Sequence, residues 1–202
     1  IYQGQELGMT NFQGSSLEDF QDIEIHHVYR EMVGSGRISH EEMMRYINHT
    51  GRDNARTPMQ WDDTEQAGFT DGTPWLRVNP NHTWLNVKEQ AGRSDSVLCF
   101  YKQLIKLRHT MDILVYGAYR LLLEESGAIF AYERSLGKER LTVLCNFTDR
   151  TQKSGLSVRE LGAGTILIGN YPDRRGISQG DAVALCEEDI CLRPYEAIVF
   201  MQ

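Results

Sequence analysis

Residues 51–62, which read GRDNARTPMQWD, hold the densest group of side chains that could do chemistry. Arg52 and Arg56 stand among carboxylates and an amide, and Trp61 follows them. A guanidinium presents a planar set of donors that suits carboxylates and sugar hydroxyls. Indole rings stack on the apolar faces of pyranose rings. The pattern therefore favours recognition of a sugar.

The same composition also fits a purely structural loop. In that alternative Arg52 and Arg56 pair internally with Asp53 and Asp62. A motif in one sequence carries a real risk of a false match, so the residues alone leave both interpretations open.

Other candidate chemistry is weaker. His26 and His27 are adjacent and cannot form a metal pair with helical i,i+4 spacing. The sequence has no glycine-rich phosphate loop and no plausible Ser-His-Asp set. We therefore predict no metal and no cofactor. The acidic residues before and within the first expected helix are interpreted as a solvated face, namely Glu18, Asp19, Asp22, Glu24 and Glu31.

Charge and composition argue against nucleic acids and membranes as partners. The chain has 202 residues and a net charge of -7, which disfavours a nucleic-acid binder because such a protein needs a basic face. No apolar run approaches the ~20 residues that span a bilayer, so we expect no membrane association. The chain has four cysteines, Cys99, Cys145, Cys186 and Cys191, and no two of them have Cys-x-x-Cys spacing. This pattern suggests free thiols in a cytoplasmic protein.

Local signals predict helices in the first half. Asp22 can cap a helix that ends near Gly34, and Ser39 with Glu42 forms a capping box for a second helix. Residues 51–93 are broken by prolines and glycines and contain three tryptophans, which indicates an ordered functional loop. A third helix, capped by Ser94, is expected over 94–109. Its apolar stripe is expected to be buried on one side and contains Val97, Tyr101, Leu104 and Ile105.

The hydrophobic period changes to two after residue 109. Strand-length runs occur at residues 121–123, 129–132, 141–144, 165–168 and 197–200, with a hairpin turn at 136–138. Short strands at this spacing indicate an antiparallel sandwich. We therefore predict an α+β chain with a boundary near residue 110. Because the chain lacks an initial Met and its apolar start runs into Gly4 like the end of a cut strand, we expect it to be the C-terminal piece of a longer protein.

Several strings resemble the oligo-1,6-glucosidase branch of the α-amylase family of glucosidases. The resemblance is most specific over residues 1–81 and extends to the end of the chain. The strings that carry it lie at residues 1–11, 19–24, 51–61, 67–70, 74–75, 78–81, 129–132, 146–147 and 192–197.

The resemblance implies a (β/α)₈ (TIM) barrel with its active site at the carboxyl ends of the strands. Residues 1–5 would finish strand eight, residues 6–93 would form the loop after it, and residues 94–109 would be the eighth helix. Residues 1–110 would thus be the end of a catalytic barrel. Residues 111–202 would be a C-terminal β-sandwich.

The implied reaction is retaining glycoside hydrolysis by an Asp nucleophile, a Glu acid–base and a second Asp. In this family these carboxylates lie on earlier strands, so we assign no catalytic residue here and predict the fragment to be inactive. Arg52 resembles the family arginine that pairs with an upstream Asp and closes the glucose pocket at its non-reducing end. Asp53 and Arg56 resemble supports of that loop. Gln5 stands where many relatives have Glu.

The expected substrate is a short isomaltose-type oligosaccharide. Two alternatives remain, a trehalose-6-phosphate hydrolase fragment and a non-catalytic structural or sugar-binding module. Exposed aromatics could bind sugar in the second alternative, and the candidates are Tyr119, Tyr132, Tyr171 and Tyr195. We also expect the fragment to self-associate through residues 1–9 and the helical stripe, because monomers rarely expose large apolar patches.

Overall fold

A computed structural model of the chain divides into two compact units, Ile1–Tyr101 and Lys102–Gln202. The structure describes residues 1–157, 164–174, 185–186 and 189–202. The helices are α1 (Ile23–Gly34), α2 (His40–Thr50), α3 (Val87–Ala91), α4 (Val97–Thr110) and α5 (Ile113–Tyr116). The strands are β1 (Ala118–Leu122), β2 (Ile129–Leu136), β3 (Glu139–Asn146), β4 (Gln152–Ser157), β5 (Thr165–Gly169), β6 (Leu185–Cys186), β7 (Asp189–Leu192) and β8 (Ala197–Met201).

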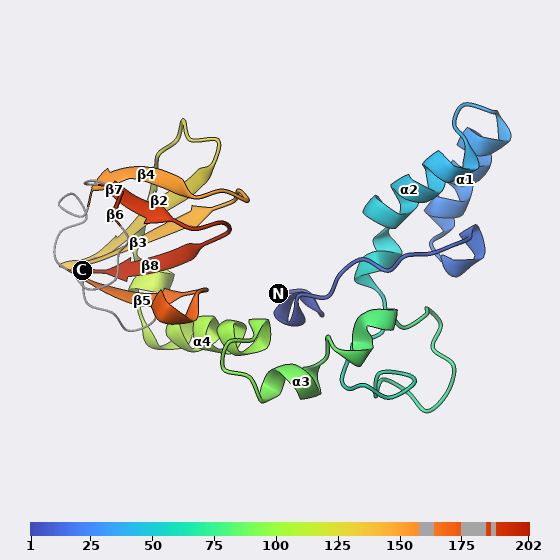
Figure 1. Cartoon of the computed structure of the whole chain (residues 1–202), viewed down its shortest axis with the longest axis horizontal. Helices are drawn as coiled ribbons and strands as arrows, with labels where there is room; N and C mark the ends of the chain where they lie inside the picture. The colour runs from blue at the N-terminus through green and yellow to red at the C-terminus, as the bar shows by residue number, and fades with distance from the viewer. Residues whose placement is uncertain (158–163, 175–184, 187–188) are drawn as a thin grey trace. The chain divides into compact units, whose positions relative to one another are not determined.

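Helices α1 and α2 lie side by side in the first unit (Figure 1). The Asp22 carboxylate accepts the Glu24 N–H at 3.0 Å, and the Ser39 hydroxyl accepts the Glu42 N–H at 3.1 Å. Both predicted helix starts are therefore confirmed, since each side chain satisfies a donor that the helix leaves open. The shared core of the pair consists of Phe12, Phe20, Ile25, Met43, Met44 and Ile47.

Buried amide side chains order the long segment after α2. Gln60 is fully buried and donates from Nε2 to the Asn81 Oδ1 and to the Leu85 carbonyl. Gln90 donates to the Leu7 carbonyl at 2.7 Å. The three tryptophans, by contrast, are all exposed, and they are Trp61, Trp75 and Trp84. The segment is ordered as predicted, but amide hydrogen bonds rather than aromatic burial hold it.

Three expectations about residues 1–110 are corrected. Residues 1–5 form no strand, and Gln5–Leu7 is a short 3-10 helix. Helix α4 begins at Val97, and the hydroxyl of Ser96, not of Ser94, accepts the Cys99 N–H at 3.2 Å. The predicted apolar stripe of α4 is not buried, since the helix contains no buried residue.

The second unit contains two antiparallel sheets. The larger has the order β1-β2-β3-β8-β5 and the smaller β4-β7-β6. The predicted hairpin is confirmed, because Leu136 pairs with Glu139 and Gly137 between them takes a φ of 60°, a value that favours glycine. Sequence reasoning missed strands β4, β6 and β7.

The two sheets share one hydrophobic cluster, and β3 is buried on both faces. The cluster between the sheets consists of Ile129, Ala131, Leu144, Ile166, Ile190, Leu192, Ile198 and Phe200. On the opposite face of the larger sheet, Leu141 and Val143 of β3 pack against Ile113 of α5. A strand buried on both faces tends to be apolar at successive positions, and β3 follows this at Leu141, Val143 and Leu144, with Thr142 as a buried polar exception.

The cysteines differ from expectation. Cys99 and Cys145 are free thiols, whereas Cys191 is disulfide-bonded. The prediction that all four are free thiols is therefore wrong. In the part of the chain that the structure describes, no helix has the length and apolar character to cross a membrane.

The contact between the sheets gives a first prediction. Phe200 is 2% exposed, whereas Phe130 on the other face of the same sheet is 43% exposed. Replacing Phe200 by Ala should lower the free energy of unfolding by about 3–5 kcal/mol, because it removes apolar contacts and leaves a cavity. Urea unfolding of the chain measures this change. Phe130→Ala is the matched control and should cost less; equal losses would contradict this account of the core.

Candidate functional site

Residues 51–62 leave α2 through a tight turn that places both arginines beside the start of α1. The Gly51 N–H donates to the Ile47 carbonyl at 2.8 Å, and the 3-10 helix Arg52–Ala55 follows. A Cβ at Gly51 would lie 2.6 Å from the Ile47 carbonyl oxygen. Only glycine allows this approach, which sends the chain back toward Asp22.

Asp53 anchors the turn from within the unit. Its side chain is 1% exposed, and its Oδ2 accepts the backbone N–H groups of Gln21 at 2.7 Å and Asp22 at 2.9 Å. Arg56 Nη1 lies 3.4 Å from its Oδ1. The carboxylate therefore joins the turn to the segment before α1, and its burial is compensated by hydrogen bonds and a charge.

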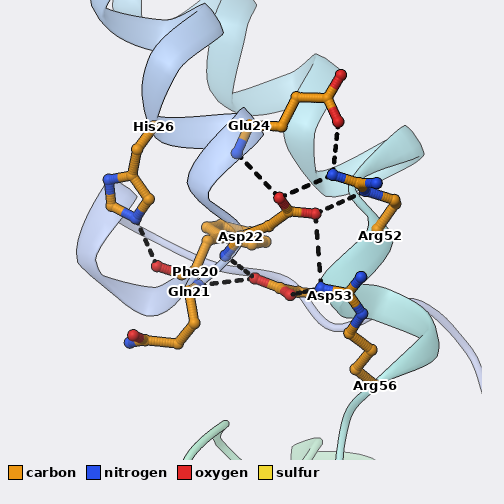
Figure 2. Close-up of polar contacts among 8 residues, drawn as sticks. All are labelled: Phe20, Gln21, Asp22, Glu24, His26, Arg52, Asp53 and Arg56. Carbon is orange, nitrogen blue, oxygen red and sulfur yellow. Dashed lines mark hydrogen bonds and ion pairs between the residues drawn. The ribbon is translucent and has the colours of Figure 1, made fainter.

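Arg52 lies against two carboxylates from the first turn of α1 (Figure 2). It donates from Nε to the Asp22 Oδ2 at 2.7 Å and from Nη2 to the Asp22 Oδ1 at 3.0 Å. Glu24 accepts a further short bond from Nη2. The Asp22 side chain is 5% exposed and that of Arg52 is 58% exposed. The Asp22 carboxylate thus lies buried beneath Arg52, and the guanidinium lies at the surface.

The charges in this cluster alternate in sign. The Arg52 hydrogen bond, the Glu24 N–H and both guanidinium charges lower the pKa of Asp22 below its ordinary value of 3.8, against the opposing effect of desolvation. The same contacts, chiefly the hydrogen bond to Asp22, raise the pKa of Arg52. Asp22 is therefore ionised at neutral pH, and the pair stays charged.

Arg52 borders three hollows in the first unit. One of about 260 Å³ lies beside Ile25, Met43 and Tyr46 of the helix pair. A second of about 520 Å³ adjoins His27 and Arg56. A third of about 420 Å³ is lined by residues 2–5, 9–11, 49–52, 54–55 and 57. Arg52 is thus placed on a concave surface and not within a core.

The predicted site residues do come together. Arg52, Asp53 and Arg56 share one network, but Asp62 is not part of it and accepts instead from Thr64 at 2.9 Å. The internal-pairing alternative therefore holds for Arg56 with Asp53 alone. The carboxylates that bind Arg52 are those of Asp22 and Glu24. The prediction of a solvated face holds for Glu24, whose side chain is 67% exposed, and is wrong for Asp22, whose side chain is 5% exposed.

Sequence reasoning missed Asp22 as a site residue, although it identified Asp22 as a helix cap. The signal that could have found it is its position at the N-cap of a helix. A carboxylate there is held by the backbone N–H that it caps, and if it is buried it needs a cation nearby.

The arrangement can bind a polar ligand. Among the described residues, every partner of the Arg52 side chain uses Nε or Nη2, so Nη1 remains as a donor for a ligand. The paired charges around Nη1 disfavour a strongly charged ligand and suit one that presents hydroxyl groups. No group of three or more His, Cys, Asp or Glu residues suited to a metal occurs within the ranges that the structure describes.

Comparison with known proteins identifies the relatives of the chain. Residues 1–117 match the family described as Alpha amylase, catalytic domain. The chain is 45% identical over 201 residues to an oligo-1,6-glucosidase of Parageobacillus thermoglucosidasius, covering 99% of this chain and 34% of that protein.

Solved structures also match over the whole chain, and two of them illustrate the likeness. The trehalose-6-phosphate hydrolase of Bacillus licheniformis superposes with a TM-score of 0.88 at 34% identity, and the isomaltulose synthase of Klebsiella sp. LX3 with a TM-score of 0.85 at 38% identity. Each covers 100% of this chain and 35% of the solved chain. The chain thus spans about a third of the length of the relatives it matches.

The Asp22 pair gives a pH prediction. Because its pKa is lower in the folded than in the unfolded chain, the ionised Asp22 contributes stability above pH 3.8, and this contribution is lost as the pH falls below that value through the folded pKa. Asp22→Asn removes the titration and retains the cap. Wild type should therefore lose more free energy of unfolding than this variant between about pH 6 and about pH 3 in urea titrations.

The control for this experiment is Asp71→Asn, a change at an exposed aspartate outside the network. It should leave the pH dependence as in wild type. An Asp22→Asn profile that coincides with wild type would contradict the role given to this carboxylate.

Proposed function

The chain belongs to the α-amylase family, and from this we propose that the complete protein containing it is a retaining α-glucosidase of the oligo-1,6-glucosidase type. Its proposed substrates are short isomaltose-type oligosaccharides, from which it removes terminal glucose. The observation that carries the proposal is the position of Arg52, which borders several hollows with a free donor while two carboxylates hold its other nitrogens. The 45% identity to an oligo-1,6-glucosidase supports the choice of substrate.

We propose a role for each site residue. Arg52 closes the glucose pocket at its non-reducing end and hydrogen-bonds the sugar. Asp53 and Arg56 fix the turn that carries it, a role that the buried Asp53 carboxylate supports. The nucleophile and acid–base carboxylates belong to the part of the protein outside this chain, so the chain alone has no catalytic residue.

The finer fold assignment is also a proposal. Residues 1–110 would complete a (β/α)₈ barrel, with α4 as the eighth helix. Residues 111–202 would form a β-sandwich domain, which the cluster between the two sheets supports.

A trehalose-6-phosphate hydrolase is the second candidate, because a solved structure with that activity superposes over the whole chain. The two candidates differ in the charge of the substrate. The neutral substrate is preferred because the identity to the oligo-1,6-glucosidase, at 45%, exceeds the 34% identity to the solved trehalose-6-phosphate hydrolase. A non-catalytic sugar-binding module remains the alternative for the chain taken alone.

Hydrolysis by the complete protein tests the proposal. We expect faster release of glucose from isomaltose than from trehalose 6-phosphate. Arg52→Ala should lower kcat/KM about tenfold or more, because a hydrogen bond from a charged group is worth about 1.5–3 kcal/mol. Arg45→Ala, which changes an exposed arginine outside the network, is the matched control and should retain wild-type kinetics.

A reversed preference would establish the phosphorylated substrate instead. The chain by itself should release no nitrophenol from a nitrophenyl α-glucoside. Turnover by the chain alone would disprove the proposal that its catalytic carboxylates lie elsewhere.

We also propose that the chain alone self-associates through residues 1–9 and the stripe on α4. Ile1, Tyr2, Val97, Leu104 and Ile105 are all exposed apolar side chains. Sedimentation should give a mass above the 23.1 kDa of a monomer. The double variant Leu104→Glu, Ile105→Glu should restore the monomer, whereas Lys106→Glu on the same helix should not. A monomeric wild type would contradict self-association.

The cytoplasmic location stays a proposal. It rests on the free thiols of Cys99 and Cys145, since free thiols persist in a reducing compartment. The disulfide at Cys191 does not contribute to this support.

A further inference from the structure

We propose that Asp22 is a positioning residue for the sugar-binding site, and that it acts by fixing the plane of the Arg52 guanidinium so that Nη1 faces the ligand. This inference rests on the proposed function, because it assigns Arg52 a sugar to bind. It gives Asp22 a role beyond the helix cap that the sequence predicted for it.

The contact between the two side chains is bidentate. The Asp22 oxygens accept from Nε at 2.7 Å and from Nη2 at 3.0 Å. Two parallel hydrogen bonds between planar groups fix orientation as well as distance. A single bond would leave the guanidinium free to rotate about it. The pair of bonds therefore determines which way Nη1 points.

Asp22 can impose this orientation because it is itself held in place. Its Oδ1 accepts the Glu24 N–H at 3.0 Å, and its own N–H donates to the buried Asp53 carboxylate at 2.9 Å. Its side chain is almost fully buried. The position of Asp22 is thus set by the start of α1 and by the turn after α2, and Arg52 receives its orientation from both.

Glu24 cannot replace Asp22 in this role. It binds the same Nη2 but its side chain is 67% exposed, and exposed ion pairs impose little restraint. Arg56 lies 3.6 Å from the Asp22 Oδ2 and neutralises charge without reaching Arg52. The orientation of Arg52 therefore depends on Asp22.

The capping and positioning roles of Asp22 can be separated by substitution. Serine caps a helix about as well as aspartate, but its hydroxyl is too short to reach a guanidinium bidentately. Asp22→Ser therefore retains the helix cap and loses the bidentate contact with Arg52. Asp22→Asn retains the shape and one acceptor. Ser39→Ala is the matched control, because it removes the cap of the neighbouring helix α2 and touches neither residue.

A double-mutant cycle in the complete protein tests the inference. Asp22→Ser should raise KM for isomaltose about tenfold with a smaller change in kcat, Asp22→Asn should raise it less, and Ser39→Ala should leave it unchanged. In an Arg52→Ala background, Asp22→Ser should change KM no further, because residues that act through one another are not additive. An equal effect in both backgrounds, or an equal effect of Ser39→Ala, would overturn the inference.

A second readout does not depend on activity. The Arg52 Nε–H resonance of the 202-residue chain, assigned by its absence in Arg52→Lys, should exchange slowly with water in wild type and in Ser39→Ala. It should exchange rapidly in Asp22→Ser. Slow exchange in Asp22→Ser would overturn the inference. If the complete wild-type protein hydrolysed no α-glucoside, the proposed function would fail, and this resonance would still decide whether Asp22 holds Arg52.

Discussion

Two buried carboxylates determine how the first unit is arranged around its site. Asp22 and Asp53 are both almost fully shielded from water, and an ionised carboxylate in that position is costly unless cations and N–H donors surround it. Here the donors come from the backbone of residues 21–24 and the cations from Arg52 and Arg56. The requirement to satisfy these two groups brings the segment before α1 and the turn after α2 together, although about thirty residues separate them.

The same principle extends through the segment that follows. In residues 51–93 the tryptophans are exposed, and the buried apolar side chains are those of Met59, Ala67, Leu76, Val78 and Leu85. Buried amides of Gln60, Asn79 and Gln90 add to this apolar packing by donating to backbone carbonyls and side chains of distant residues. Buried polar groups must be paired, so each amide fixes the path of the chain where it is inserted.

Local signals in the sequence predicted local structure well. Asp22 and Ser39 marked both helix starts, the period of two marked five strands, and the glycine at 137 marked the hairpin. What local signals could not supply was pairing over distance. Nothing near Arg52 in the sequence indicates that its partner is Asp22, and the strands β4 and β7 lack the alternation of the others. For the apolar stripe on α4, the sequence predicted the helix correctly but not its exposure. Whether a helix face is buried depends on distant parts of the fold that could cover it. The composition of residues 51–62 and the family resemblance pointed to the candidate site, whereas the buried Asp22 carboxylate beneath Arg52 was found only in the structure.

The central claim is that Arg52 forms the rim of a sugar pocket while Asp22 holds it from beneath. A crystal structure of the complete protein with glucose bound is the most direct test. The account predicts a sugar hydroxyl within hydrogen-bond distance of Arg52 Nη1, at about 3 Å, with Nε still bound to Asp22. A sugar bound elsewhere in the protein, or an Arg52 side chain turned away from both Asp22 and the ligand, would contradict it.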